Sequence, residues 1–172
     1  METALVVRES KQTDFAEKLQ LVTFTLSGEE YAVDILKVQE INRMKDITRV
    51  PNAPYYVEGV INLRGKVIPV VSLRKFFGLP NEEDRTKQKI MIMDIQGTTI
   101  GLIVDTVSEV LRISSSIVEP PPPMTYSVTT EFISGIAKLE DRLIILIDMD
   151  KLIGKEESQR MVGLTEKQAI EG

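Results

Sequence analysis

Two of the residue types that most often carry out catalysis are absent from this chain of 172 residues. The sequence contains no histidine and no cysteine, which removes the commonest general base, the Ser-His-Asp triad, the thiol nucleophile and the usual zinc ligands. The carboxylates Asp148 and Asp150 follow an apolar stretch, but one such pair fits metal binding only weakly and is typical of a solvated strand end. We therefore expect no metal site, no cofactor and no enzymatic activity.

A glycine-rich stretch superficially resembles a phosphate-binding loop. Five residues separate Gly59 from Gly65, where that motif has four, and Val67 follows Lys66 where Ser or Thr should coordinate magnesium. The spacing excludes a nucleotide site, so a binding function is the default interpretation.

The overall charge narrows the class of partner. The formal net charge is −5 and aromatic residues make up 5% of the chain, which argues against a nucleic-acid partner because such partners need a basic, stacking surface. We find no secretory leader pattern and no apolar run long enough to span a bilayer. The sequence thus predicts a soluble cytoplasmic protein without membrane insertion.

The sequence contains an internal repeat, so the same structural elements are expected twice. Leu26–Arg43 aligns with Ile95–Arg112 at an offset of 69 residues, set by Gly28 and Gly97, and apolar residues match apolar residues throughout. The identical positions are Gly28/Gly97, Val38/Val107, Glu40/Glu109 and Arg43/Arg112. This agreement predicts a duplicated scaffold.

A second block repeats in the same way. Gly59–Leu73 aligns with Gly135–Met149 at an offset of 76 residues. The larger offset places an insertion in the second copy, around Ser114–Ser116 and the four prolines at 120–123. We interpret the proline run as a stiff surface connector.

The local pattern predicts short strands joined by tight turns. Val22, Phe24 and Leu26 alternate with threonines, which is the period of a half-buried strand. Two-residue turns are expected at Ser27-Gly28, Arg64-Gly65, Gln96-Gly97 and Glu140-Asp141. Helical turns are expected over Lys11–Leu19 and Arg74–Leu79, whereas Leu36–Asn42 fits either period.

These elements predict an all-β protein made of two small barrels that share a boundary, with short helical turns. The expected divisions are a variable segment over 1–18, a first barrel over 19–80, a linker over 81–89, a second barrel over 90–153 and a tail over 154–172. The terminal segments are free to pair across the barrels.

Three blocks of the sequence carry a resemblance to a known family. They are Glu58–Gly65 followed by Pro69-Val70 and Leu73, then Asp34–Ile41, and Gly101–Asp105 leading to Val107. In this order and spacing the chain resembles the CheW family of chemotaxis coupling proteins from about Leu21 to Ile153.

The resemblance implies a fold, a function and partners. It implies two SH3-like, five-stranded barrels and a non-enzymatic adaptor that couples chemoreceptors to the histidine kinase CheA in signalling arrays. The partners would be the cytoplasmic tip of a methyl-accepting chemotaxis protein and the regulatory domain of CheA, at receptor clusters on the membrane. The kinase-facing residues are not identified.

The resemblance also implies a receptor-binding groove near the boundary of the barrels. The matching residues are Val22, Ile35, Val38, Glu40, Ile41, Asn62, Arg64 and Val107. An apolar floor with a polar rim suits a helical receptor tip. For the apolar members, ordinary barrel core is the alternative, and for Asn62 it is hydrogen bonding within its own turn.

Arg64 is the most informative of these residues. Its counterpart in the second copy is Glu140, so the turn reverses its charge between copies. A residue needed only for turn geometry would be indifferent to that sign, whereas the planar guanidinium suits a specific carboxylate partner. The alternative is a solvated hairpin tip.

Two other classes of function stay open from the sequence. One is an enzyme or small-ligand binder with a pocket between the barrels, which the lack of histidine and cysteine disfavours. The other is a scaffold or assembly module with the same double-barrel fold outside chemotaxis.

Overall fold

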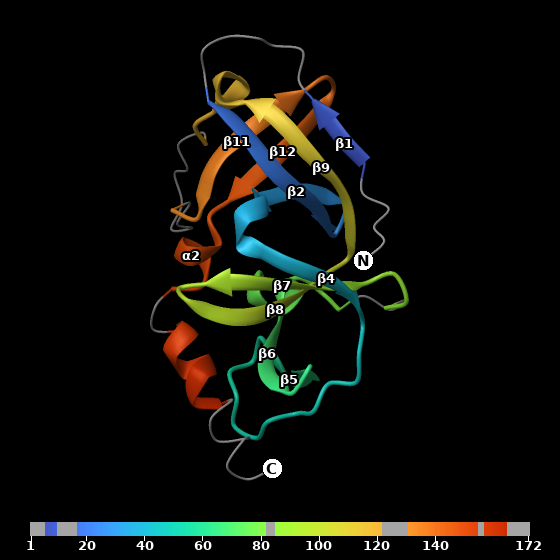
Figure 1. Cartoon of the computed structure of the whole chain (residues 1–172), viewed down its shortest axis with the longest axis vertical. Coiled ribbons are helices and arrows are strands. Elements are labelled where there is room, and N and C mark those ends of the chain that lie inside the picture. The colour runs from blue at the N-terminus through green and yellow to red at the C-terminus, as the bar shows by residue number, and fades with distance from the viewer. Residues whose placement is uncertain (1–5, 10–16, 82–84, 122–130, 155–156, 165–172) are drawn as a thin grey trace.

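Two β-barrels are stacked along the long axis of the molecule in the computed structural model, which describes residues 6–9, 17–81, 85–121, 131–154 and 157–164 (Figure 1). Barrel A, at the top of Figure 1, contains β2 (Lys18–Leu26), β3 (Glu29–Asp34), β9 (Thr106–Ser114), β11 (Ile133–Leu139) and β12 (Arg142–Ile147), extended by β1 (Val6–Glu9) and β10 (Val118–Glu119). Barrel B contains β4 (Val38–Arg43), β5 (Val57–Leu63), β6 (Lys66–Ser72), β7 (Lys89–Ile95) and β8 (Thr98–Val104). The short helices are η1 (Ile35–Lys37), η2 (Ser115–Ile117), α1 (Leu73–Phe76) and α2 (Met149–Leu152). The expected all-β fold with two five-stranded barrels is confirmed.

The barrels are not contiguous in sequence, which corrects the expected boundaries 19–80 and 90–153. The β2–β3 hairpin of the first copy lies between β9 and β12 of the second copy, and the β7–β8 hairpin of the second copy lies between β4 and β6 of the first. Each copy thus inserts its first hairpin into the barrel of the other. Parallel contacts, β3 with β12 and β6 with β8, complete the exchange.

The duplication extends to the strand register. In the antiparallel pairs, Ile41 lies opposite Met91 in barrel B and Val110 opposite Val22 in barrel A. In the parallel pairs, Val70 lies opposite Gly101 and Leu146 opposite Ala32. These partners are related by the two offsets read from the sequence, so the two barrels are built on one plan.

Tight turns join the hairpins as the sequence predicts. Ser27, Arg64, Gln96 and Glu140 all have left-handed backbone angles, with φ between 51° and 57°. In three of the four turns a glycine with positive φ follows. This backbone form matches the twist of the flanking strands, which explains why four unlike side chains occupy one conformation.

A glycine lets each barrel close. In barrel B, Thr48 bridges to Val60 of β5, and a Cβ on the preceding Gly59 would lie 2.1 Å from the Thr48 carbonyl oxygen. In barrel A, β10 pairs with β11, and a Cβ on Gly135 would lie 2.4 Å from Cγ1 of Val118. The repeated glycine therefore permits the close strand approach that completes the barrel.

The largest apolar core lies between the barrels rather than within either. It takes outward-facing residues of both sheets and of the helices that follow β6 and β12. Its fully buried members include Phe24, Leu26, Leu73, Met91, Met93, Leu102 and Ile153. Two smaller clusters fill the barrels themselves. Because the halves share a core, neither buries its apolar surface alone.

Two ion pairs fasten the points where the chain crosses between barrels. At the β8–β9 crossover, Asp105 accepts from Arg74 Nε and Nη2 at 2.8 and 2.7 Å and from the Ser27 N–H at 2.8 Å. At the β3–β4 crossover, Lys37 lies 3.0 Å from Asp150, which also accepts from the Gln96 N–H at 2.7 Å. The two sites are counterparts with the charges exchanged. The first pair is nearly buried and the second is exposed.

Several local expectations need correction or detail. Lys18 and Leu19 belong to β2 instead of the expected helix over Lys11–Leu19, because strand β9 pairs with them, and residues 11–16 lie outside the described part. The expected turn over Arg74–Leu79 is confirmed as α1, with Gly78 at φ 73°. In the tail, residues 157–164 form a helix that buries Met161 in the inter-barrel core.

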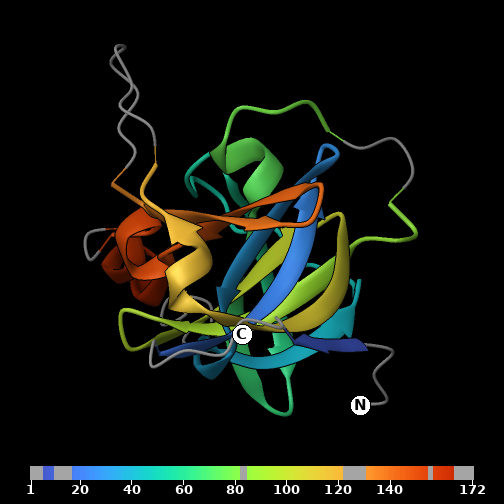
Figure 2. The same cartoon turned by 90° about the horizontal axis from the view of Figure 1, so that it is seen from above.

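The C-terminal helices and strand β4 lie on different sides of the molecule. Viewed from above, α2 and the helix over 157–164 lie away from β4 (Figure 2). Part of the linker, residues 82–84, and the prolines at 122 and 123 lie outside the described residues. No helix within the described ranges is long and apolar enough to cross a membrane.

Candidate functional site

Four of the predicted site residues gather at the waist of the molecule. Ile35 lies on η1, Val38 and Ile41 on β4 and Val107 on β9. All four are half-buried and pack against the inter-barrel core. They form an apolar strip whose inner side is core and whose outer side is open to solvent, so both interpretations of these residues hold in part.

Val22 does not join this strip at the surface. Its side chain is 2% exposed, and it pairs across β2 with Val33 and Val110. Both faces of β2 are covered, one by the interior of barrel A and the other by the inter-barrel core. The expectation that Val22 contacts a partner directly is therefore wrong, because the side chain has no free surface.

Arg64 and Glu40 form an ion pair on the other face of β4 from the strip, because Glu40 lies opposite Ile92 whereas Ile41 lies opposite Met91. Arg64 donates through Nη1 to Glu40 Oε1 at 3.3 Å and through Nη2 to Oε2 in a closer contact. Hydrogen bonding between them lowers the pKa of Glu40 and raises that of Arg64. The Arg64 side chain is 71% exposed and that of Glu40 is 24% exposed. The carboxylate thus holds a guanidinium that still faces solvent.

Glu109, the counterpart of Glu40, pairs with an arginine from a different element. In barrel A, Glu109 receives Arg142 Nη2 at 2.6 Å, and Arg142 also binds Glu30 at 2.6 Å. Hydrogen bonds to these carboxylates, Glu30 foremost, raise the Arg142 pKa. Arg142 stands two residues after Glu140, at the start of strand β12, and its side chain is 25% exposed. The second copy therefore satisfies the same glutamate from the strand, which leaves Glu140 free to replace the turn arginine.

Asn62 serves the turn itself. Its Oδ1 accepts a hydrogen bond from the Gly65 N–H at 2.9 Å, and the side chain is exposed at the end of β5. This is the local role that the sequence left open. Asn62 orders the backbone that carries Arg64, so it supports the ion pair from within the hairpin.

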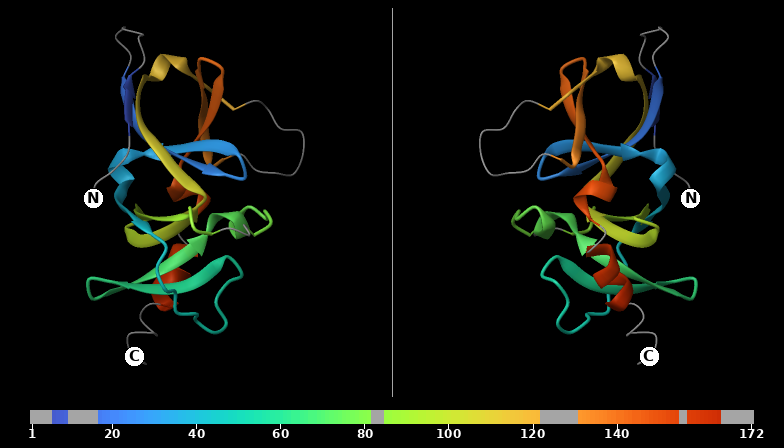
Figure 3. Two further views of the ribbon diagram at one scale, coloured as in Figure 1. Left: turned by 90° about the vertical axis from the view of Figure 1, so that its right-hand side faces the viewer. Right: turned by 90° about the vertical axis from the view of Figure 1, so that its left-hand side faces the viewer.

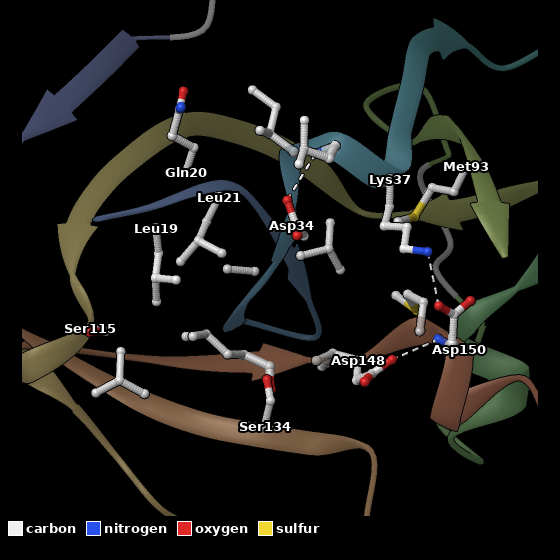
Figure 4. Close-up of a pocket in the computed structure, with 18 of the residues that line it drawn as sticks. Leu19, Gln20, Leu21, Asp34, Lys37, Met93, Ser115, Ser134, Asp148 and Asp150 are labelled. Carbon is white, nitrogen blue, oxygen red and sulfur yellow. Dashed lines mark hydrogen bonds and ion pairs between the residues drawn. The ribbon is translucent and has the colours of Figure 1, made fainter. Parts of the chain in front are cut away.

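An open cavity of about 590 Å³ lies at the mouth of barrel A. Its apolar lining includes Leu19, Leu21 and Leu146, and its edge carries the Lys37–Asp150 ion pair (Figure 4). Ile35 is the one predicted site residue that lines it. The cavity and the Arg64–Glu40 ion pair are therefore separate features.

The carboxylate pair at the end of β12 has structural partners. Asp148 caps α2 by accepting from the backbone N–H groups of Asp150 and Lys151, and Asp150 pairs with Lys37. Within the described ranges no cluster of three or more potential metal-ligating side chains occurs. The Gly59–Lys66 stretch is the β5–β6 hairpin.

The structure adds residues that the sequence argument missed. Val110 is the counterpart of Ile41 and packs half-buried against the same core, so the repeat alone could have found it. Leu36 is 87% exposed on η1, beside the strip. Nothing in its local pattern distinguishes an exposed leucine from a buried one.

Two intertwined barrels, with an apolar strip at their junction and an arginine fixed by Glu40 on the β5–β6 turn, define a β-barrel scaffold module. The chain belongs to the CheW-like domain family, whose model matches residues 20–157. It is thus an adaptor or scaffold domain of the chemotaxis type, as the three sequence blocks predict.

Individual relatives agree with this assignment. The chemotaxis protein CheW of Helicobacter pylori is 37% identical over 147 residues, covering 86% of this chain and 88% of that protein. The chemotaxis protein CheW of Klebsiella aerogenes is 36% identical over 138 residues, covering 80% and 83%. The crystal structure of the scaffolding protein TtCheW from Thermoanaerobacter tengcongensis matches with a TM-score of 0.73 at 41% identity, covering 82% of this chain and 96% of that one.

Proposed function

We propose that this protein couples chemoreceptors to the histidine kinase CheA and thereby lets receptors control the kinase. In this proposal it acts without catalysis, at the cytoplasmic tips of receptors gathered in the membrane. Its contribution is a coupling free energy: it holds receptor and kinase in a geometry in which the state of one changes the activity of the other.

The observation that carries the proposal is the exposed Arg64 held by Glu40 of β4, the strand that also carries Val38 and Ile41 of the apolar strip. A guanidinium whose position is fixed loses less side-chain entropy when it binds a partner. Its counterpart turn carries Glu140, and the matching glutamate there is satisfied by Arg142. Barrel A folds without an arginine at that turn, so the turn geometry does not require one. Binding to an external partner is therefore the best explanation for the arginine at position 64.

The apolar strip supports the same proposal. Val38, Ile41 and Val107 offer half-buried aliphatic surface, and Glu40 of the same strand β4 adds the charged pair with Arg64. A receptor tip is a helical hairpin, and helix docking uses an apolar floor bordered by polar residues. We assign the receptor to this strip. We assign the kinase regulatory domain to other surfaces of the barrels.

Co-sedimentation tests the proposal. Receptor-containing membranes are mixed with purified CheA and this protein, and each component is quantified in the pellet. We expect the protein to sediment with receptor membranes and to increase the amount of CheA that sediments. Val38→Asp should reduce its own sedimentation at least tenfold, since a carboxylate in an apolar contact is costly to desolvate.

The matched control is the neighbouring residue of the same strand. Gln39 is exposed on β4, so Gln39→Asp adds the same charge without entering the strip. Circular dichroism melts accompany both variants. If Val38→Asp sediments as wild type does, or if Gln39→Asp is equally impaired, the strip is not the receptor site.

A further inference from the structure

Among the described residues, no strand pairs with the outer edge of β4, whereas its counterpart β9 is paired on both edges. In barrel A, β9 pairs with β2 on one side and with β1 on the other. In barrel B, β4 pairs with β7 on one side, and no strand among the described residues pairs with its other edge. Figure 3 shows β1 along β9, with β4 below them. The duplication thus leaves one strand position empty.

The empty edge has the sequence and register of the filled one. β1 lies parallel to the Glu-Val-Leu-Arg run at 109–112, and the counterpart run at 40–43 is Glu-Ile-Asn-Arg. Both runs use the same register toward their inner neighbours, Ile41 opposite Met91 and Val110 opposite Val22. The outer backbone groups are therefore presented in equivalent order on both strands.

Some residues on β4 are more exposed than their counterparts on β9, as expected if a neighbouring strand covers β9 and none among the described residues covers β4. Glu109 is buried on β9, whereas its counterpart Glu40 is half-buried on β4. The exposed residues Arg43 and Lys45 follow along the free strand. Charges at an exposed edge discourage indiscriminate strand pairing. They leave the edge open to a segment whose own charges match.

The register of β1 specifies the matching segment. Val7 lies opposite Val110 and Glu9 lies opposite Arg112. Transferred to β4, these positions face Ile41 and Arg43. Opposite charges and paired aliphatic residues at facing positions favour strand association.

We propose that the β4 edge over Glu40–Arg43 is a strand-addition site for a short extended segment of a partner protein. The segment runs parallel to β4, with an aliphatic residue opposite Ile41 and an acidic residue opposite Arg43. Backbone hydrogen bonds supply the attachment and the two side-chain positions supply the selectivity. The inference does not rest on the receptor assignment, because a helical receptor tip engages side chains rather than a strand edge.

A peptide titration of the full chain tests the site. The probe is a blocked peptide with the sequence of residues 3–11, added to isotope-labelled protein and followed by NMR. We expect shift changes and slower amide exchange over Glu40–Arg43. A nitroxide at the peptide N-terminus should broaden Val38 more than Arg43, as parallel addition requires.

Charge exchange makes the test specific. The Glu9→Lys peptide should bind about two- to fivefold more weakly, the size of one cross-strand charge pair. Arg43→Glu in the protein should restore its binding. The matched control is Arg112→Glu on β9, where the edge is already occupied, and it should leave peptide binding at β4 unchanged.

Four results would each overturn the proposal. These are no change over Glu40–Arg43 at the solubility limit of the peptide, changes confined to β9 through displacement of β1, and preferential broadening of Arg43. The fourth is a peptide-free dimer, seen by sedimentation velocity, that protects the β4 amides, because a second copy would then be the occupant.

Discussion

At the scale of single residues, one glutamate position shows how a duplicated chain specialises. Glu40 and Glu109 are identical and occupy equivalent strand positions, yet their arginines come from different places. In barrel A the arginine is part of β12 and bonds two carboxylates, and in barrel B it stands on the exposed turn. The glutamate is paired with an arginine from a strand in barrel A and with an arginine from an exposed turn in barrel B. The second arginine is the more accessible of the two to a partner.

Reversal of Arg64 tests this difference. Arg64→Glu removes an exposed ion pair with Glu40, and solvent screening keeps the stabilisation from such pairs small, so the melting temperature should fall only slightly. Assembly with receptor membranes and CheA should fall more, since a charged interface contact is worth about 2–5 kcal/mol on truncation or reversal. Quantitative co-sedimentation and a thermal melt measure both.

The matched variant is Glu140→Arg, at the counterpart turn of barrel A. It should leave both the melt and the assembly close to wild type. Normal assembly by Arg64→Glu would show that Arg64 is a solvated hairpin tip.

At the scale of elements, the structure explains why glycine is repeated at Gly59 and Gly135. At each position a second segment of the chain approaches closely to complete the barrel. Gly59 has φ 148°, and an added Cβ would meet a backbone oxygen of the bridging strand. At Gly135 the nearest obstacle is a valine side chain. A backbone atom yields less than a side chain, so the two glycines should differ in their tolerance.

Alanine substitution at Gly59, with Gly28 as the control, measures the cost of filling this close approach. Gly59→Ala should lower the free energy of unfolding by about 2–4 kcal/mol, from backbone strain together with the clash. Gly28→Ala, at φ 84° with no atom near the added Cβ, should cost about 1 kcal/mol. Urea unfolding gives both values. Equal losses at the two positions would contradict the closure role of Gly59.

The crossover ion pairs predict a dependence on acid. Burial opposes ionisation of Asp105, but hydrogen bonds from Arg74 and the Ser27 N–H outweigh it, so the pKa of Asp105 is lowered. A carboxyl with a lowered folded-state pKa stabilises the fold above its unfolded pKa, about 4, and this stabilisation is lost as the pH falls through the folded value. Part of the acid unfolding should therefore come from Asp105.

Two matched substitutions separate this contribution. Asp105→Asn leaves Arg74 nearly buried without its charge partner and should cost about 3–5 kcal/mol at pH 7, with a flatter stability profile below pH 4. Asp150→Asn, at the exposed counterpart, should cost about 0–1 kcal/mol. Urea titrations across pH measure both. A similar loss from the two variants would refute the asymmetry of the crossovers.

At the scale of the whole molecule, the sequence predicts the components better than their assembly. The four turns, the strands and the duplication follow from glycine spacing and period-two patterns, and each is found in the structure. Hairpin exchange does not follow from them, because the two first hairpins share one sequence pattern, which does not indicate the barrel that each hairpin joins. Likewise, neither alternation nor the family resemblance indicates that both faces of β2 are covered and that Val22 is buried.

The exchange predicts that the halves depend on each other. A fragment of residues 1–88 lacks β7 and β8, and a fragment of residues 89–172 lacks β2 and β3. Each alone should show no cooperative thermal transition, since its barrel misses two strands and the shared core is divided. Mixed, they should regain the far-ultraviolet circular dichroism of the intact chain. A cooperative melt of either isolated fragment would contradict the intertwined fold as the unit of stability.

The central claim is that this protein couples receptor state to kinase activity by position alone. The most direct measurement is CheA autophosphorylation on receptor-containing membranes, with and without this protein and with and without receptor ligand. We expect that the protein changes the autophosphorylation rate and makes it respond to ligand, and that the folded Arg64→Glu variant does neither. A kinase rate that is the same with and without the folded wild-type protein, and equally unresponsive to ligand, would contradict the account.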